Sequence, residues 1–115
     1  MGPRAEAGNV SKKVRAILAD LRRRLQALYG PRLAALVLYG SHARDEAAPG
    51  SDIDVLVALT GPVSPCAEIA RTAEIVSDVS LEHGETVACA FVSQDQYARE
   101  QSPLLLNVRR AGVPV

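Results

Sequence analysis

The sequence has little cysteine and no long apolar segment. Cys66 and Cys89 form no Cys-x-x-Cys pair, and no histidine adjoins either of them. This spacing excludes a disulfide framework and a zinc site. None of the apolar runs approaches the ~20 residues that a membrane-spanning helix needs, and the polar N-terminus does not resemble a secretion signal. We therefore expect a cytoplasmic protein with no membrane segment.

The chain also has no net charge, since 13 basic residues balance 13 acidic ones. This balance argues against a surface built to hold nucleic acid. The charges are unevenly placed, because residues 1–32 carry eight basic and two acidic side chains. Such a bias is typical either of a docking face for an acidic partner or an RNA, or of the solvated side of an amphipathic helix. We favour the second interpretation.

One compact domain is expected from 115 residues with 48% hydrophobic content. Residues 1–10 have no apolar period and predict a flexible lead-in, which leaves residues 11–115 as a single domain. Three short apolar runs predict strands covered on both faces, as in the interior of a sheet. These runs are residues 33–39, 53–59 and 87–92.

Helical periodicity predicts two long helices. The first begins at Ser11 as its N-cap and ends before Gly30 and Pro31, and the second covers residues 65–83 and ends at Gly84. The positions expected to face the core are Val14, Ile17, Leu18, Leu21, Leu25 and Leu28 in the first helix, and Ile69, Ala73, Val76 and Val79 in the second.

Shorter helices are predicted at three further places. Residues 41–44 would begin a helix directly after the first strand, and Ser93 with Gln96 forms a capping-box pattern. Residues 103–110 predict a last helix that ends at Gly112. The order helix, strand, strand, helix, strand, helix predicts an α/β (α+β) layered domain.

A Gly-Ser pair stands directly after the first strand. Gly40 has no Cβ and allows the backbone to approach a phosphate closely. Ser41 adds a hydroxyl beside the backbone amides of a helix N-terminus, which is an anion-binding arrangement. A Gly-Ser pair on its own is most often only a turn, so its weight comes from its combination with acidic residues at the start of the next strand.

Two carboxylates open the second strand. Asp52 and Asp54 are two residues apart at its mouth and therefore point to the same face. A pair of carboxylates on one face suits Mg²⁺, which takes phosphate oxygens as further ligands. The alternative is a turn residue and a solvated acid. An acid within the apolar run of residues 53–59 is costly to bury unless it binds a cation or hydrogen-bond donors.

These segments resemble the signature of a known family. Residues 38–44 (LYGSHAR) and 50–57 (GSDIDVLV) are similar to the DNA polymerase beta-like nucleotidyltransferase superfamily, in particular its minimal (MNT) type. The resemblance implies a small mixed, largely antiparallel sheet flanked by helices. It also implies that Gly40 and Ser41 bind a nucleoside triphosphate, and that Asp52 and Asp54 are the catalytic pair that ligates two Mg²⁺ ions.

The resemblance suggests a role for one basic residue and for a partner protein. Arg44 matches the basic residue that usually follows the Gly-Ser pair, where it either contacts phosphates or is a solvated loop arginine. Minimal members are often the antitoxin halves of pairs whose partner is a helical HEPN-type ribonuclease. Some of them transfer AMP from ATP to a tyrosine of that partner. A homo-oligomer is also compatible with so small a domain.

The third carboxylate of active family members is not evident. It is expected on the strand at residues 87–92, which contains no acid, and Ala88 or a neighbour stands in its place. Glu85, just before this strand, is either a substitute or an ordinary loop acid. Two functions therefore remain open. One is a Mg²⁺-dependent nucleotidyltransferase, and the other is a catalytically weak or inactive nucleotide-binding module that acts on its partner by contact.

Overall fold

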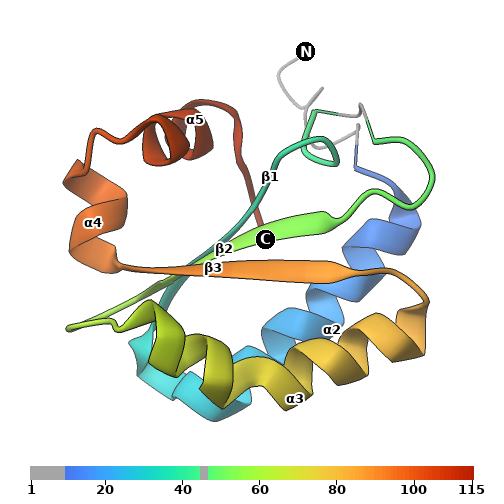
Figure 1. Cartoon of the computed structure of the whole chain (residues 1–115), viewed down its shortest axis with the longest axis horizontal. Helices are drawn as coiled ribbons and strands as arrows, with labels where there is room; N and C mark the ends of the chain where they lie inside the picture. The colour runs from blue at the N-terminus through green and yellow to red at the C-terminus, as the bar shows by residue number, and fades with distance from the viewer. Residues whose placement is uncertain (1–9, 45–46) are drawn as a thin grey trace.

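The computed structural model describes residues 10–44 and 47–115 of the chain. The flexible lead-in expected over residues 1–10 lies outside the described residues, apart from Val10, which is buried in the core. No helix in the described ranges is long and apolar enough to cross a bilayer. The elements (Figure 1) are α2 (Lys12–Tyr29), the 3₁₀ turn η1 (Gly30–Arg32), β1 (Leu33–Tyr39), β2 (Ile53–Leu59), α3 (Pro65–His83), β3 (Val87–Ser93), α4 (Gln94–Arg99), α5 (Pro103–Ala111) and β4 (Val113–Pro114).

The strands form one mixed sheet in the order β3-β2-β1-β4. Strand β1 is antiparallel to β2 and to β4, whereas β2 and β3 run parallel. The connection between β2 and β3 is the long helix α3, as parallel neighbours require. The α+β class and the mixed, largely antiparallel sheet predicted from the sequence are confirmed.

Helices cover both faces of the sheet (Figure 1), with α2 and α3 on one side and α4 and α5 on the other. Alternate residues of the central strands supply two separate cores. Leu38 and Val55 belong to the core beneath α2 and α3. Val37 and Leu56 pack with Leu105 and Val108 of α5. Apart from Asp54, both faces of β1 and β2 are therefore apolar, which explains their hydrophobic runs.

Capping residues set the helix ends as predicted. The Ser11 hydroxyl accepts a hydrogen bond from the Val14 amide at 3.1 Å. The capping box of α4 is complete, with both hydrogen bonds between Ser93 and Gln96 at 3.0 Å. Gly84 ends α3 in the left-handed region at φ 70°. Each of these local signals was correctly interpreted from the sequence.

The buried face of α3 differs from the expected one. Ile69 is 52% exposed, whereas Glu68 and Thr72 are buried with Val79. The reason is a polar contact between the two long helices, in which the Tyr29 hydroxyl donates to Glu68 Oε1 at 2.6 Å. This contact rotates α3 so that an acid lies inside. Leu28 of α2 was also expected in the core and is 43% exposed.

The basic residues of α2 make contacts within the chain. Lys13 pairs with Glu85 at 2.9 Å, and Arg24 pairs with Glu82 at 2.7 Å. Arg22 donates to the carbonyl of Val115 at 2.6 Å. These contacts support the interpretation of the basic segment as the outer side of an amphipathic helix.

We expect Tyr29→Phe to lower the free energy of unfolding by about 1–3 kcal/mol, because Glu68 would lose a donor inside the protein. Tyr29 is 6% and Glu68 4% exposed. The Tyr29 hydrogen bond and the Arg71 guanidinium hold the pKa of Glu68 below its usual range. The stability from this contact is therefore present at neutral pH and is lost as the pH falls through that lowered pKa.

Urea unfolding at several pH values measures this difference. The hydroxyl of Tyr97 makes none of the hydrogen bonds found among the described residues, so Tyr97→Phe is the control and should change stability little. If Tyr29→Phe lowers the unfolding free energy equally at pH 7 and at pH 3, the assignment is contradicted, because the tyrosine hydrogen bond stabilises the ionised form of Glu68.

The short edge strand β4 was not predicted. Val113 and Pro114 pair with Leu38 and Val37 of β1, and the Val115 amide donates to the Leu36 carbonyl at 2.9 Å. Gly112 makes this return possible, since a Cβ there would lie 2.5 Å from the Val108 carbonyl oxygen. The C-terminal residues thus close the sheet beside β1.

Candidate active site

The predicted Gly-Ser turn lies where β1 ends. The Gly40 carbonyl accepts hydrogen bonds from the amides of Ala43 at 3.1 Å and Arg44 at 3.3 Å. Residues 41–44 form a turn, and the helix expected there is not present in the described residues. One isolated turn gains few hydrogen bonds for the dihedral angles that it orders, and only Ala43 of this turn is buried.

Asp54 lies directly beside Gly40. It pairs with Tyr39 across β1 and β2. Gly40 has φ 77°, and a Cβ at this position would lie 2.6 Å from Asp54 Oδ2. The missing side chain of Gly40 therefore provides the space in which the Asp54 carboxylate sits. The sequence suggested that this glycine makes room for a phosphate, but not that it makes room for the aspartate.

The Asp54 carboxylate is electrostatically unfavourable as it stands. Burial raises its pKa above the usual range, and the neighbouring charge of Asp52 raises that pKa further, while His42 opposes both effects. Asp52 itself is exposed at the start of the strand. A cation would offset both causes, because it neutralises the two charges and replaces lost water with a ligand bond. The donors present therefore fit Mg²⁺.

His42 connects the turn to the strand that carries the aspartates. Its Nε2 atom donates to the carbonyl of Ser51 at 3.1 Å. Ser51 immediately precedes Asp52, so this hydrogen bond holds the Gly-Ser turn against the mouth of β2. Ser41 is half-buried in the same turn, and Arg44 is exposed at its end. The phosphate-contacting role predicted for Arg44 stays a prediction.

The match to a family of known proteins decides the class of the domain. The model of the nucleotidyltransferase domain (NTP_transf_2) matches residues 18–102, which include the turn, both aspartates and all three long strands. The chain belongs to this family. Among curated proteins, none matches the chain.

Two solved structures share the fold of this nucleotidyltransferase domain. One, a crystal structure of a toxin-antitoxin with AMP-PNP, is 19% identical, with a TM-score of 0.58 over 90% of this chain and 72% of that chain. The other, a mutant of the toxin-antitoxin MntA-HpeT, is 20% identical, with a TM-score of 0.55 over 88% of this chain and 70% of that chain. At these identities the similarity establishes the fold alone.

The register of β3 identifies the neighbour of Asp54 in the nucleotidyltransferase domain. Asp54 pairs with Ala88, so the strand offers a methyl group where a third carboxylate was expected. Glu85 does not take this place, because it lies before the strand and pairs with Lys13 of α2 at 2.9 Å. That ion pair lowers the pKa of Glu85. Across residues 10–44 and 47–115, no three acidic, histidine or cysteine side chains group as a metal site.

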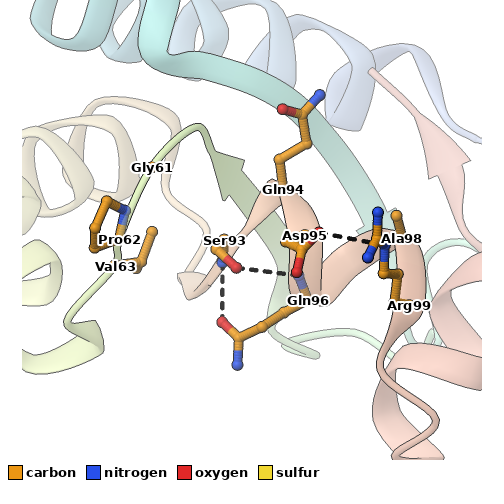
Figure 2. Close-up of a pocket in the computed structure, with 9 residues that line it drawn as sticks. All are labelled: Gly61, Pro62, Val63, Ser93, Gln94, Asp95, Gln96, Ala98 and Arg99. Carbon is orange, nitrogen blue, oxygen red and sulfur yellow. Dashed lines mark hydrogen bonds and ion pairs between the residues drawn. The ribbon is translucent and has the colours of Figure 1, made fainter.

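Among the described residues, a cavity larger than any near the Gly-Ser turn lies at the other end of the sheet. It has a volume of about 760 Å³ and lies where β2 and β3 end, lined by residues 61–63 and 93–99 apart from Tyr97 (Figure 2). Figure 2 shows its polar groups engaged with one another, with Ser93 bonded to Gln96 and Asp95 paired with Arg99. None of the predicted site residues lines it, so its size alone does not indicate the active site.

A smaller cavity adjoins the Gly-Ser turn. Its volume is about 330 Å³, and its lining includes His42, Gly50 and Glu85. It lies behind the turn on the side of α2, because Ser11 also lines it. Gly40, Ser41 and the two aspartates are not among the residues that line it.

Proposed function

We propose that this nucleotidyltransferase domain binds a Mg²⁺-bound nucleoside triphosphate and transfers a nucleoside monophosphate, AMP from ATP, to a hydroxyl of a protein acceptor. The observation that carries this proposal is the contact between Gly40 and Asp54. A backbone without Cβ and a partly buried carboxylate occupy the same small space, next to a second carboxylate. A domain that served only as a scaffold would have no reason to retain this unfavourable arrangement.

The roles of the residues follow from their chemistry. Asp52 and Asp54 would hold Mg²⁺, and the Ser41 hydroxyl with the amides of the turn would bind phosphate oxygens. When bound, Mg²⁺ neutralises charge on the phosphate oxygens. The acceptor oxygen forms a bond to the α-phosphorus, the bond from that phosphorus to pyrophosphate breaks, and the hydroxyl proton leaves to water. The domain contributes mainly position and electrostatics to this reaction.

A HEPN-type toxin is the acceptor that we propose. The support is the fold shared with chains from toxin-antitoxin structures, one of them with AMP-PNP. The test is to incubate the purified protein with labelled ATP, Mg²⁺ and the product of the neighbouring gene. We expect label on the partner. If ATP binds and the partner stays unlabelled, the result contradicts the proposed transfer activity.

A second candidate is a nucleotide-binding antitoxin that neutralises its partner by contact. The absence of an acid at Ala88 favours it. In that case the double change Asp52→Asn and Asp54→Asn would leave neutralisation of the toxin intact. Loss of neutralisation by this folded double variant would exclude the contact mechanism.

We expect Ala88→Asp to raise Mg²⁺ affinity and the transfer rate by about tenfold, because it places a third carboxylate beside Asp54. Without Mg²⁺ the same change should lower the unfolding free energy by roughly 1 kcal/mol through like-charge repulsion. Mg²⁺ titration calorimetry and thermal unfolding with and without Mg²⁺ measure both effects.

Ala70→Asp is the matched control for this variant. Ala70 is exposed on α3, which covers the face of the sheet opposite to that of Asp54. It adds the same charge without completing the carboxylate group. Equal gains from both variants would show that net charge, and not the geometry at Ala88, raises the affinity.

A further inference from the structure

The turn after β1 meets the mouth of β2 at two places. A Cβ on Gly40 would lie 2.6 Å from Asp54 Oδ2, so the glycine makes room for this carboxylate. Two residues further along the turn, His42 Nε2 donates to the Ser51 carbonyl at 3.1 Å. Ser51 directly precedes Asp52. One residue of the turn is therefore engaged beside each of the two aspartates.

The backbone is held on both sides of Asp52. Before it, the Ser51 carbonyl accepts the hydrogen bond from His42. After it, the Ile53 amide donates to the Thr86 carbonyl at 2.8 Å, where β2 meets the start of β3. The side chain of Asp52 is exposed, so packing does not fix it. Its position depends on the two flanking peptide groups, and the imidazole holds one of them.

His42 itself stands on an anchored backbone. The Gly40 carbonyl accepts the Ala43 amide at 3.1 Å and the Arg44 amide at 3.3 Å, which closes the turn. Ala43 is 5% exposed and belongs to the core beneath α2 and α3. The half-buried imidazole lies between this buried residue and Ser41. It can therefore transmit the position of the turn to the strand that carries the aspartates.

The contacts of His42 argue for an indirect role toward a ligand. Its Nε2 proton is used by the Ser51 carbonyl and is not available to a phosphate oxygen. The imidazole also borders the cavity of about 330 Å³ behind the turn, together with Ser11 and Glu85, and neither aspartate lines that cavity. The side chain thus joins two parts of the predicted site without belonging to its ligand-binding groups.

We propose that His42 is a positioning residue, which fixes the distance between the Gly-Ser turn and Asp52 so that one Mg²⁺-bound triphosphate reaches both. This inference rests on the proposed function and adds a residue to its site. The turn then positions both carboxylates, with Gly40 in contact with Asp54 and His42 bonded to the peptide group before Asp52. Ser41 lies between these two turn residues, where its hydroxyl is predicted to bind phosphate.

Two substitutions of His42 test the hydrogen bond. His42→Ala removes the donor, and we expect about tenfold weaker binding of Mg²⁺ with a nonhydrolysable ATP analogue, since the loss of groups that orient metal ligands typically costs at least this much. His42→Gln keeps an N–H donor at a similar reach and should bind within about threefold of the wild type. Titration calorimetry of the full chain measures both affinities.

His83→Ala is the matched control. The Nε2 atom of His83 is also bonded to an oxygen, Asp20 Oδ2 at 3.0 Å, and its side chain is 28% exposed. This contact joins α2 to α3 on the face of the sheet opposite to that of Asp54. We expect His83→Ala to lower the midpoint of thermal unfolding and to leave the affinity for Mg²⁺ and the ATP analogue unchanged. General destabilisation is thereby separated from loss of position.

A double variant tests whether His42 acts through Asp52. If it does, the losses of Mg²⁺ affinity caused by His42→Ala and by Asp52→Asn should be less than additive, because the second change finds the carboxylate already removed. Steady-state transfer gives a further check. We expect the KM for Mg²⁺-ATP to rise about tenfold in His42→Ala and kcat to change less than threefold, since the imidazole does not contact the reacting groups.

The outcomes separate this proposal from the transferase function. Wild-type affinity in His42→Ala, a glutamine variant as weak as the alanine variant, additive losses with Asp52→Asn, or an equal loss in His83→Ala would each overturn the role of His42. Binding of Mg²⁺-ATP by the wild type without transfer of label would overturn the transfer, and the affinities of the variants would still decide the role of His42. A wild type that does not bind Mg²⁺-ATP would overturn both.

Discussion

Asp54→Asn is expected to abolish Mg²⁺-dependent transfer, with a loss of about 10³-fold or more, while the protein stays folded. The carboxylate lies against Gly40, where a Cβ would come within 2.6 Å of its Oδ2 atom. An amide is a far weaker Mg²⁺ ligand than a carboxylate and does not neutralise the ion. Transfer of labelled AMP and Mg²⁺ titration calorimetry measure the loss.

The Asp54→Asn variant should be at least as stable as the wild type, although it loses activity. Burial and the charge of Asp52 raise the pKa of Asp54, so the ionised carboxylate opposes folding at neutral pH. Removing that charge should leave the unfolding free energy equal to or above that of the wild type. Asp78→Asn, on the exposed surface of α3, is the control and should change neither property. A destabilised Asp54→Asn protein would indicate a structural role for the carboxylate.

Gly40→Ala is expected to weaken binding of Mg²⁺-ATP about tenfold or more, because the added Cβ displaces the Asp54 carboxylate. Two costs act at this position. The backbone has φ 77°, which a side chain tolerates at about 1–2 kcal/mol, and the Cβ meets Asp54 Oδ2 at 2.6 Å. The backbone strain lowers stability alone. The contact of the new Cβ with Asp54 lowers stability and also disturbs the predicted metal site.

Gly50→Ala separates the two costs. Gly50 has φ 86°, and a Cβ there meets nothing within 4 Å. Gly50→Ala should therefore lose only the unfolding free energy of the backbone strain, and Gly40→Ala at least as much, in urea unfolding. Only Gly40→Ala should lose nucleotide binding in calorimetry. If both variants lose nucleotide binding equally, backbone strain causes the loss, and the contact between Gly40 and Asp54 does not.

Much of the fold could be predicted because its signals are local. The runs of β1 and β2 are apolar, apart from Asp54, since each strand is covered on both faces. The caps at Ser11, Ser93 and Gly84 identify helix ends. Strand β4 could not be predicted, because Val113 and Pro114 carry no pattern of their own. They become a strand only through pairing with β1.

The errors in the predicted fold have a common origin. Ile69 was assigned to the core of α3 from its spacing, but the buried contact of Tyr29 with Glu68 rotates the helix. The helix expected at residues 41–44 is a single turn, because little of it is buried. In both cases a tertiary contact, or the lack of one, outweighed the local preference.

The sequence alone determined the family signature, the order of the long elements and the two neighbouring carboxylates, since each depends on residues close together in the chain. The tertiary structure decided which residues meet. It brought Asp54 against Gly40, placed Ala88 beside it and turned Glu85 to Lys13. These features depend on strand register between distant segments, and a shift of one residue would reverse every side chain.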